Sequence, residues 1–439
     1  MIGKHYSILV ILWVVVLSTA CASYTQETQR IRGLFKMGNY KTALEDLEKS
    51  DLKDSSSSHL LYLLEKAMIL DRMGELKKSQ AALKEADRLV DKLYTVSISK
   101  TALSFVHNDS SADYSGEDYE KVAIHTQLAM SFIEQGDYQS ARVEAAKINN
   151  MLYEINQGYD EGNRNTYGED AFARYLSAVI YESRQEWDSA IIDYRKALKL
   201  YAGPYSKFGG GNMPENLIVA LHRLYLKRDR QSDAKVLEKT YPKLTARSQK
   251  RFDKEKKSKK SYGEIIVVHE MGNIAYKTAQ EFIFPIGGQI VRFSFPVISG
   301  TSGFGYSGKT GFTVIASKKT IKADIVQDMT EIARVTLEER RARMVAKQTA
   351  RLILKGQVAE QARQNFGELA GLATNLLMGA TETADTRSWT LQPEAFAISR
   401  YRVPVGNYKI KIITNGKVSD IVTAKVERDK AVIFRGVNK

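Results

Sequence analysis

The chain has 439 residues, of which 26% are charged and 43% hydrophobic, so it can form two or three folded domains and is neither wholly disordered nor collagen-like. Its single cysteine excludes internal disulfides and any zinc site built from several cysteines. A formal net charge of +14 would suggest nucleic acid in a cytosolic protein, but the sequence contains no motif that binds RNA or DNA.

The first residues, 1–20, have the pattern of an export signal. Lys4 precedes ten apolar residues, 8–17, which as a helix would span about 15 Å, or roughly half of a bilayer core. The residues up to Cys21 resemble a bacterial lipobox, although Ser18 occupies the position three before the cysteine and the usual leucine, Leu17, lies one place earlier. The resemblance implies that Cys21 carries a lipid such as palmitate. The alternative is an ordinary secretory signal followed by a buried free cysteine.

The residues after Cys21 bear on the destination of such a lipoprotein. Ala22 and Ser23 follow it, so the second mature position lacks the aspartate that commonly retains Gram-negative lipoproteins in the inner membrane. The resemblance therefore implies an outer-membrane lipoprotein that faces the periplasm. In that compartment we expect the positive charge to meet an anionic envelope polymer or lipid headgroups rather than nucleic acid.

Between residues 25 and 244 a short signature recurs, in which glycine is followed two places later by an aromatic residue and five places later by alanine. Glycine relieves a tight turn between helices, and alanine lets the next helix approach closely. The pattern resembles the tetratricopeptide repeat, which implies an all-α solenoid over residues 21–246 with a groove for a protein or peptide. The alternative is a generic helical bundle. The signature residues are Gly38, Tyr40, Ala43, Gly74, Gly136, Tyr138, Ala141, Trp187 and Ala190, with Gln185 in one glycine place and a weaker copy at 229–234.

Two kinds of segment interrupt or end this pattern. The copies lie farther apart than the family period of about 34 residues, so we expect inserts at 96–116 and 157–168. Residues 247–261 then hold eight Lys or Arg against two acids. We interpret this run as a basic linker or exposed helix end between two domains. The alternative is a contact with anionic headgroups, at about 1 kcal/mol per basic residue.

Residues 262–439 change character and predict an α+β region with antiparallel strands, a long helix and a small β module at the end. The expected helix covers residues 325–363, and an apolar stretch at 366–379 is expected to be a buried helix. The order of repeat, strands, long helix and Ala-Asp-Thr-Arg-Ser-Trp resembles a family of tetratricopeptide-repeat bacterial envelope lipoproteins with no known reaction. We expect Asp385 and Arg387 to form a buried salt bridge beneath Trp389. The expected strands lie at 264–269, 281–285, 290–296, 312–316, 394–399, 407–413 and 431–434.

The sequence matches known enzyme motifs only weakly. The loop 300–311 matches the P-loop pattern through Gly303, Gly308, Lys309 and Thr310, and the dinucleotide pattern through Gly303, Gly305 and Gly308. Both chemistries need a helix after the loop, whereas the residues that follow read as a strand, so we expect a glycine-rich connection. The histidines have no partners at ligand spacing and no catalytic constellation is present. We therefore expect no enzyme, no cofactor and no metal.

The leading interpretation is a lipid-anchored periplasmic adaptor. Its repeats would bind a protein partner in envelope assembly, secretion or cell-wall synthesis. The alternative is a protein that binds, or even hydrolyses, peptidoglycan or another glycan through its C-terminal domain.

Overall fold

The computed structural model describes residues 24–99, 112–157, 167, 169–203, 205, 213–286, 289–299, 309–341, 344–345, 361, 363–364 and 384–438. The signal segment 1–20, Cys21, most of the loop 300–311 and the apolar stretch 366–379 lie outside these residues, so the expectations for them stay predictions. Much of both expected inserts also lies outside them.

The N-terminal half is helical, as the repeat pattern predicts, and most of its helices pack in consecutive pairs. In the described residues, α3 pairs with α4, α5 with α6, α7 with α8, α9 with α10 and α11 with α12. The helices are α2 (Tyr24–Glu27), α3 (Gln29–Lys36), α4 (Tyr40–Glu48), α5 (His59–Arg72), α6 (Leu76–Ser99), α7 (Asp118–Glu134), α8 (Tyr138–Gln157), α9 (Ala171–Ser183), α10 (Trp187–Ala202), α11 (Glu215–Lys227), α12 (Gln231–Thr240) and α13 (Pro242–Lys257).

The turn inside each pair repeats one backbone geometry. At the first turn, the Gly38 N–H donates to the Phe35 carbonyl at 3.0 Å and the Asn39 N–H to the Leu34 carbonyl at 2.9 Å, which is a Schellman motif. The motif needs a left-handed residue, which glycine supplies without strain. That position has a φ of 80° at Gly38, 79° at Gly74, 73° at Gly136, 60° at Gln185 and 53° at Asp229.

The small residue that follows each turn lets the paired helices touch. It is fully buried at Ala43, Ala141 and Ala190, and nearly so at Ala234 and at Ser79 in the second pair. Because these side chains are no larger than a hydroxymethyl group, the second helix can lie close against the first. The aromatic residue of the signature packs near the same turn: the rings of Phe35 and Tyr40, for example, lie edge to face at 5.3 Å.

The C-terminal half is built from strands in two sheets and a hairpin. We call the sheet with the order β10-β1-β7-β6 the inner sheet, and the sheet with the order β5-β4-β8-β9 the outer sheet. The strands are β1 (Tyr262–Met271), β2 (Tyr276–Ile286), β3 (Gln289–Ser299), β4 (Gly311–Val314), β5 (Lys319–Lys322), β6 (Asp324–Asp328), β7 (Ala395–Pro404), β8 (Gly406–Thr414), β9 (Lys417–Val426) and β10 (Ala431–Val437).

The helices, the inner sheet and the outer sheet form three layers. Alternate residues of β1 divide between two cores, because successive side chains of a strand point to opposite faces. Ile266 and Val268 join the core of the helical half, whereas Ile265 and Val267 pack with Phe312 and other residues of the outer sheet. The inner sheet is therefore covered on both faces, and the helical half shares its main core with the C-terminal half.

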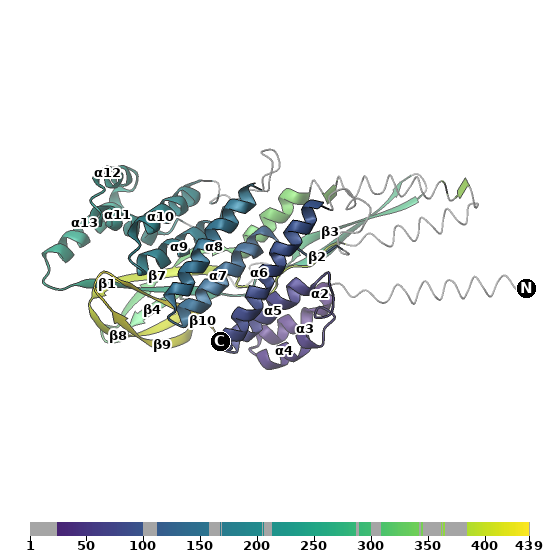
Figure 1. The fold of residues 1–439 in the computed structure, drawn as a ribbon, viewed down its shortest axis with the longest axis horizontal. Helices are drawn as coiled ribbons and strands as arrows, with labels where there is room; N and C mark the ends of the chain where they lie inside the picture. The colour runs from purple at the N-terminus through teal and green to yellow at the C-terminus, as the bar shows by residue number, and fades with distance from the viewer. Residues whose placement is uncertain are drawn as a thin grey trace, which may run out of the picture.

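Figure 1 shows the arrangement along the long axis of the molecule. Helices α2–α4 lie near one end of the helical array and α11–α13 near the other, with both sheets beside the helices. The hairpin β2–β3 extends lengthwise away from the sheets. Among the described residues, no helix combines the length and the apolar character needed to cross a bilayer.

Two features differ from the sequence prediction. The long helix does not begin at residue 325: residues 324–328 form β6, and helix is described for 329–341. The strands are not all antiparallel, because β10 returns to the free edge of β1 and pairs with it in parallel. The basic run follows one of the interpretations given above, the helix end, because its residues up to Lys257 form the end of α13, which starts at Pro242.

Candidate functional site

The first helices of the pairs present one side to the C-terminal half, and we call this the sheet-facing side of α5, α7, α9 and α11. Its contacts are polar as well as apolar. Carboxylates on these helices bind an arginine or backbone N–H groups of residues more than 200 positions later in the chain. Arginines on the same helices contact carboxylates of β1. The repeat resemblance implies a groove for a partner, and these contacts occupy this side of the helices.

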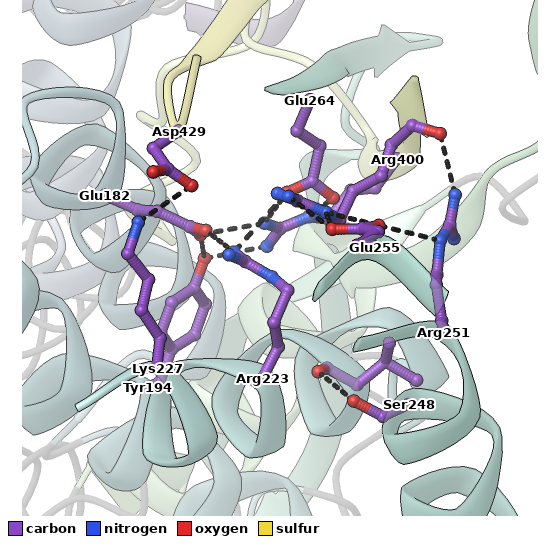
Figure 2. Close-up of polar contacts among 12 residues, drawn as sticks. Glu182, Tyr194, Arg223, Lys227, Ser248, Arg251, Glu255, Glu264, Arg400 and Asp429 are labelled. Carbon is purple, nitrogen blue, oxygen red and sulfur yellow. Dashed lines mark hydrogen bonds and ion pairs between the residues drawn. The ribbon is translucent and has the colours of Figure 1, made fainter. Parts of the chain in front are cut away.

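One polar contact is the Arg400 cluster, formed by Glu182, Tyr194, Arg223, Glu264 and Arg400 (Figure 2). The Arg400 guanidinium, on β7, lies 2.8 Å from Glu182 of α9 and 2.9 Å from Glu264 of β1. It also donates to the Tyr194 hydroxyl at 2.7 Å. Arg223 of α11 contacts both carboxylates. Two guanidinium groups thus balance two carboxylates between three helices and the inner sheet.

Burial and charge oppose each other in this cluster. All of its charged side chains are buried. Burial alone would raise the pKa of Glu264, but the Arg400 and Arg223 guanidinium groups outweigh it and hold that pKa below its usual value. Glu264 is therefore an anion at neutral pH. An ion pair of this kind gives little net stability but is costly to break, because the remaining partner would be a buried lone charge.

A second group, the Arg435 cluster, lies on the same side and comprises Asp71, Arg72, Glu270 and Arg435. The fully buried Arg435 guanidinium, on β10, lies 2.6 Å from Asp71 of α5 and 2.7 Å from Glu270 of β1. Arg72 contacts Glu270 at 2.9 Å. The two clusters fix the register of the inner sheet against the helices at two separate points.

Between these helices and the sheet runs an extended stretch that we call the buried segment, residues 384–394. It has no regular secondary structure, so its backbone groups need other partners. The Glu65 carboxylate of α5 accepts from the N–H groups of Thr390 at 2.7 Å and Leu391 at 3.0 Å. Glu120 of α7 accepts from the Trp389 N–H at 2.8 Å. The helices therefore hold an extended peptide of their own chain, with a fully buried indole at its centre.

The residues singled out by the sequence lie at the start of this segment. The Arg387 guanidinium contacts the Asp385 carboxylate at 2.8 Å and donates to the carbonyls of Ser57 and Ala112, both at 2.9 Å. Arg387 thereby ties the buried segment to the residues that precede α5 and α7. The indole N–H of Trp389 is buried without a hydrogen-bond partner among the described atoms.

One pair of carboxylates at the start of α7, Glu117 at the N-cap and Glu120 in the first turn, has the split pKa values that acid–base catalysts show. Burial and the neighbouring Glu117 raise the pKa of Glu120. Arg340 and Lys277 outweigh burial and lower the pKa of Glu117. Both side chains are buried, however, and the Glu120 oxygens accept from Tyr114 and Trp389, so no substrate can approach them in this state. The pair holds the interface together.

Other sequence candidates also occupy structural positions. Tyr138 accepts from the Ile433 N–H at 3.2 Å, and the Trp187 ring lies 4.1 Å from the Lys227 ammonium. The signature residues thus shape the turns and cores instead of lining one site. Over the described part of the chain, no three His, Cys, Asp or Glu side chains come together as a metal site would need.

The sequence prediction missed the charged clusters. One signal was available: Arg400 interrupts the apolar run of β7, and His269 and Glu270 follow that of β1. A charge inside a buried strand needs a partner of opposite charge. The partner cannot be identified from spacing, because Glu182 lies 218 residues before Arg400.

Among the open surfaces of the helical half in the described residues is one that we call the terminal groove. It lies between α10 and α11–α12, has a volume of about 700 Å³ and is lined by, among others, Ile192, Arg195, Lys196, Lys199, Val236 and Tyr241. Ile192 is 54% exposed and Val236 is 69% exposed. Three basic side chains therefore border two apolar ones that no other part of the described chain covers.

No protein-family model matches the chain, and no curated protein matches it. Solved structures of repeat proteins are similar to about half of the chain. They include a kinesin light chain from Podosopora anserina with nearly identical TPR-like repeats (15% identity, TM-score 0.32, 51% of this chain and 95% of that one). Another is MamA from Desulfovibrio magneticus RS-1 (13% identity, TM-score 0.29, 53% of this chain and 96% of that one). A third is BtubC from P. vanneervenii (15% identity, TM-score 0.30, 57% of this chain and 85% of that one).

Proposed function

We propose that the chain is a non-enzymatic, lipid-anchored scaffold protein of the bacterial envelope that binds a protein partner through the terminal groove. The observation that carries this proposal is the contrast between two surfaces of one solenoid. The sheet-facing side is filled by the chain itself, whereas the groove between α10 and α12 keeps exposed apolar side chains. Helical-repeat solenoids present extended surfaces that bind proteins.

Self-occupancy argues against a partner on the sheet-facing side. A competing peptide would have to displace the buried segment, including the fully buried Trp389 and the hydrogen bonds to Glu65 and Glu120. Freeing the two carboxylates without a replacement donor would cost about 1–3 kcal/mol for each buried group. Binding at the terminal groove requires no such displacement.

The side chains of the terminal groove indicate the chemistry of its partner. Arg195, Lys196 and Lys199 lie along α10, and the acidic residue of the lining, Asp233, is held by Arg230 at 2.7 Å. The complementary ligand is a protein segment with two or three apolar side chains and flanking acidic residues. Charge complementarity would speed its association and make binding weaker at high salt.

Anchoring through Cys21 and an outer-membrane location facing the periplasm are part of the proposal and are supported by the lipobox-like residues before Cys21. We also propose that the protein catalyses no reaction. The burial of Glu117 and Glu120, the carboxylate pair with split pKa values, supports this part of the proposal. We propose envelope assembly, secretion or cell-wall synthesis as the setting.

The test is site-specific photocrosslinking of the full chain in intact cells. A photoreactive residue replaces Val236 in the terminal groove or, as the matched control, Val143, which is 45% exposed on α8 outside that groove. We expect a protein crosslink at position 236 and none at 143, formed through a net-acidic segment of the partner. The crosslink should disappear in Ile192→Asp. Equal crosslinking at both positions, or a product that survives Ile192→Asp, would refute the terminal groove as the binding surface.

A further inference from the structure

A separate cleft lies in the C-terminal half, beside the outer sheet. It has a volume of about 1010 Å³, larger than the terminal groove, and it is lined by residues of β4, β5 and β8 and by residues at one end of the inner sheet. A cleft of this size falls at the upper end of the range for small-molecule sites. None of its lining residues belongs to the Arg400 or Arg435 cluster.

One side of the cleft is strongly basic. The strand register places Gly311 between Lys322 and Ile413, and Thr313 between Thr320 and Lys411. These residues share the face of the outer sheet that points away from its core, since the alternate residues Phe312 and Ile412 are buried in that core. Lys309 and Lys318 add two further ammonium groups to the lining.

The positive charge of the cleft is uncompensated. The lining contains four lysines, and its described residues include no carboxylate. In the part of the chain that the structure describes, none of the four ammonium groups lies within 4.0 Å of an acidic side chain. An anion that entered the cleft would meet several ammonium donors without first breaking an ion pair.

The other side of the cleft is apolar. Met271, Ile325 and Ala397 line it from the end of the inner sheet, where Ile325 is paired with Ala397 across β6 and β7. Ile413 and the 40% exposed Ile315 continue this surface on the outer sheet. A ligand could therefore bury alkyl groups against these side chains while its charged end contacted the lysines, at about 0.8 kcal/mol for each buried CH₂ group.

From this division we infer that the cleft binds a single anionic amphiphile, a molecule with an acyl or alkyl chain and a phosphate or carboxylate head group. The alkyl chain lies against Met271 and Ile325, and the head group contacts Lys322 and Lys411. Such a ligand site is independent of the terminal groove, which lies on the helical half. A glycan fits less well, because the described lining has no aromatic ring on which a sugar could stack and no carboxylate to accept from its hydroxyl groups.

The inference is tested by titrating the full-length protein with three probes below their micelle concentrations: dodecyl phosphate, dodecyl maltoside and inorganic phosphate. Binding is followed by calorimetry, and the stoichiometry by native mass spectrometry. The test variant is Lys322→Ala with Lys411→Ala. The matched control is Lys409→Ala with Lys417→Ala, which removes the same charge from exposed positions of the same sheet outside the cleft.

We expect one molecule of dodecyl phosphate to bind, at least tenfold more tightly than either other probe. The affinity should fall about tenfold or more in the test variant and less than threefold in the control. Equal binding of dodecyl maltoside would show a site without anion recognition, and equal binding of inorganic phosphate would show one without chain recognition; either result overturns the inference. No binding, or equal losses in both variants, also overturns it. These probes leave the photocrosslink at Val236 untouched, so the two proposals fail separately.

Discussion

Between the two sheets lies a buried histidine whose protonation should be visible in the stability of the protein. His269 of β1 is fully buried, and its two ring nitrogens lie 3.0 Å from the hydroxyls of Thr414 and Ser399. Burial lowers the pKa of His269 to about 3 from its usual 6.5. The folded state therefore holds this imidazole neutral over a pH range in which the unfolded chain protonates it.

The sign and size of the effect follow from linkage. A lowered histidine pKa contributes stability that is fully present above pH 6.5 and is lost as the pH falls toward 3, because only the unfolded chain gains the proton. Between pH 7.5 and pH 5, a shift from 6.5 to about 3 corresponds to a loss of about 2 kcal/mol in the free energy of unfolding. Glu394, whose pKa burial raises to about 7, acts in the opposite direction, so the wild-type curve alone would not isolate His269.

The assay is urea unfolding of the wild type and of His269→Gln from pH 7.5 to pH 5, followed by tryptophan fluorescence, to which the buried Trp389 contributes. Glutamine keeps a donor and an acceptor but has no titrating group. We expect the stability difference between the two proteins to shift by about 2 kcal/mol in favour of the variant as the pH falls. His59→Gln, at the partly exposed start of α5, is the control. A difference between wild type and His269→Gln that stays constant within about 0.5 kcal/mol would refute the buried neutral imidazole.

Three further predictions concern the interface, the turns and the anchor. Arg400→Met should lower the free energy of unfolding by about 3–5 kcal/mol in urea unfolding, because it leaves buried carboxylates one cation short; a loss under 1 kcal/mol would contradict the cluster. Gln185→Gly should stabilise by about 0.5 kcal/mol, whereas Gly136→Ala should destabilise by about 1 kcal/mol, because both positions have a positive φ; thermal unfolding that moves both variants in one direction would contradict this. Cys21→Ser should move the protein out of the membrane fraction, and its retention there after a carbonate wash would rule out the lipid anchor.

The helical half could be predicted because its signals are local. A positive-φ turn and a small residue five places later lie within one short stretch of sequence, so even Gln185 in the glycine place was recognisable. The weaker copy at Asp229 has the same geometry. Only the backbone conformation, which several residue types can adopt at a modest cost, is common to all five turns.

The C-terminal half was harder because its determinants are distant in the sequence. The run at 324–328 reads as the first turn of a helix but pairs with β7, whose partner residues follow it by more than sixty positions. Strand β9 was missed because most of its residues are exposed or half-buried and it lacks a clean apolar alternation. Contacts between distant residues, such as Glu182 and Arg400, determine which part of the chain covers the sheet-facing side. No local sequence pattern reveals such pairs.

The position of β10 along the chain has a consequence for folding during synthesis. Arg435 follows its partner Asp71 by 364 residues, which ribosomes translating at 5–20 residues per second need about 20–70 s to add. Helices that folded during that interval would have part of their sheet-facing side uncovered until this strand was added. A purely apolar side would invite aggregation during such a delay. The carboxylates of that side would stay hydrated during the delay, so we expect charges that contribute little to the finished fold to oppose aggregation of its precursor.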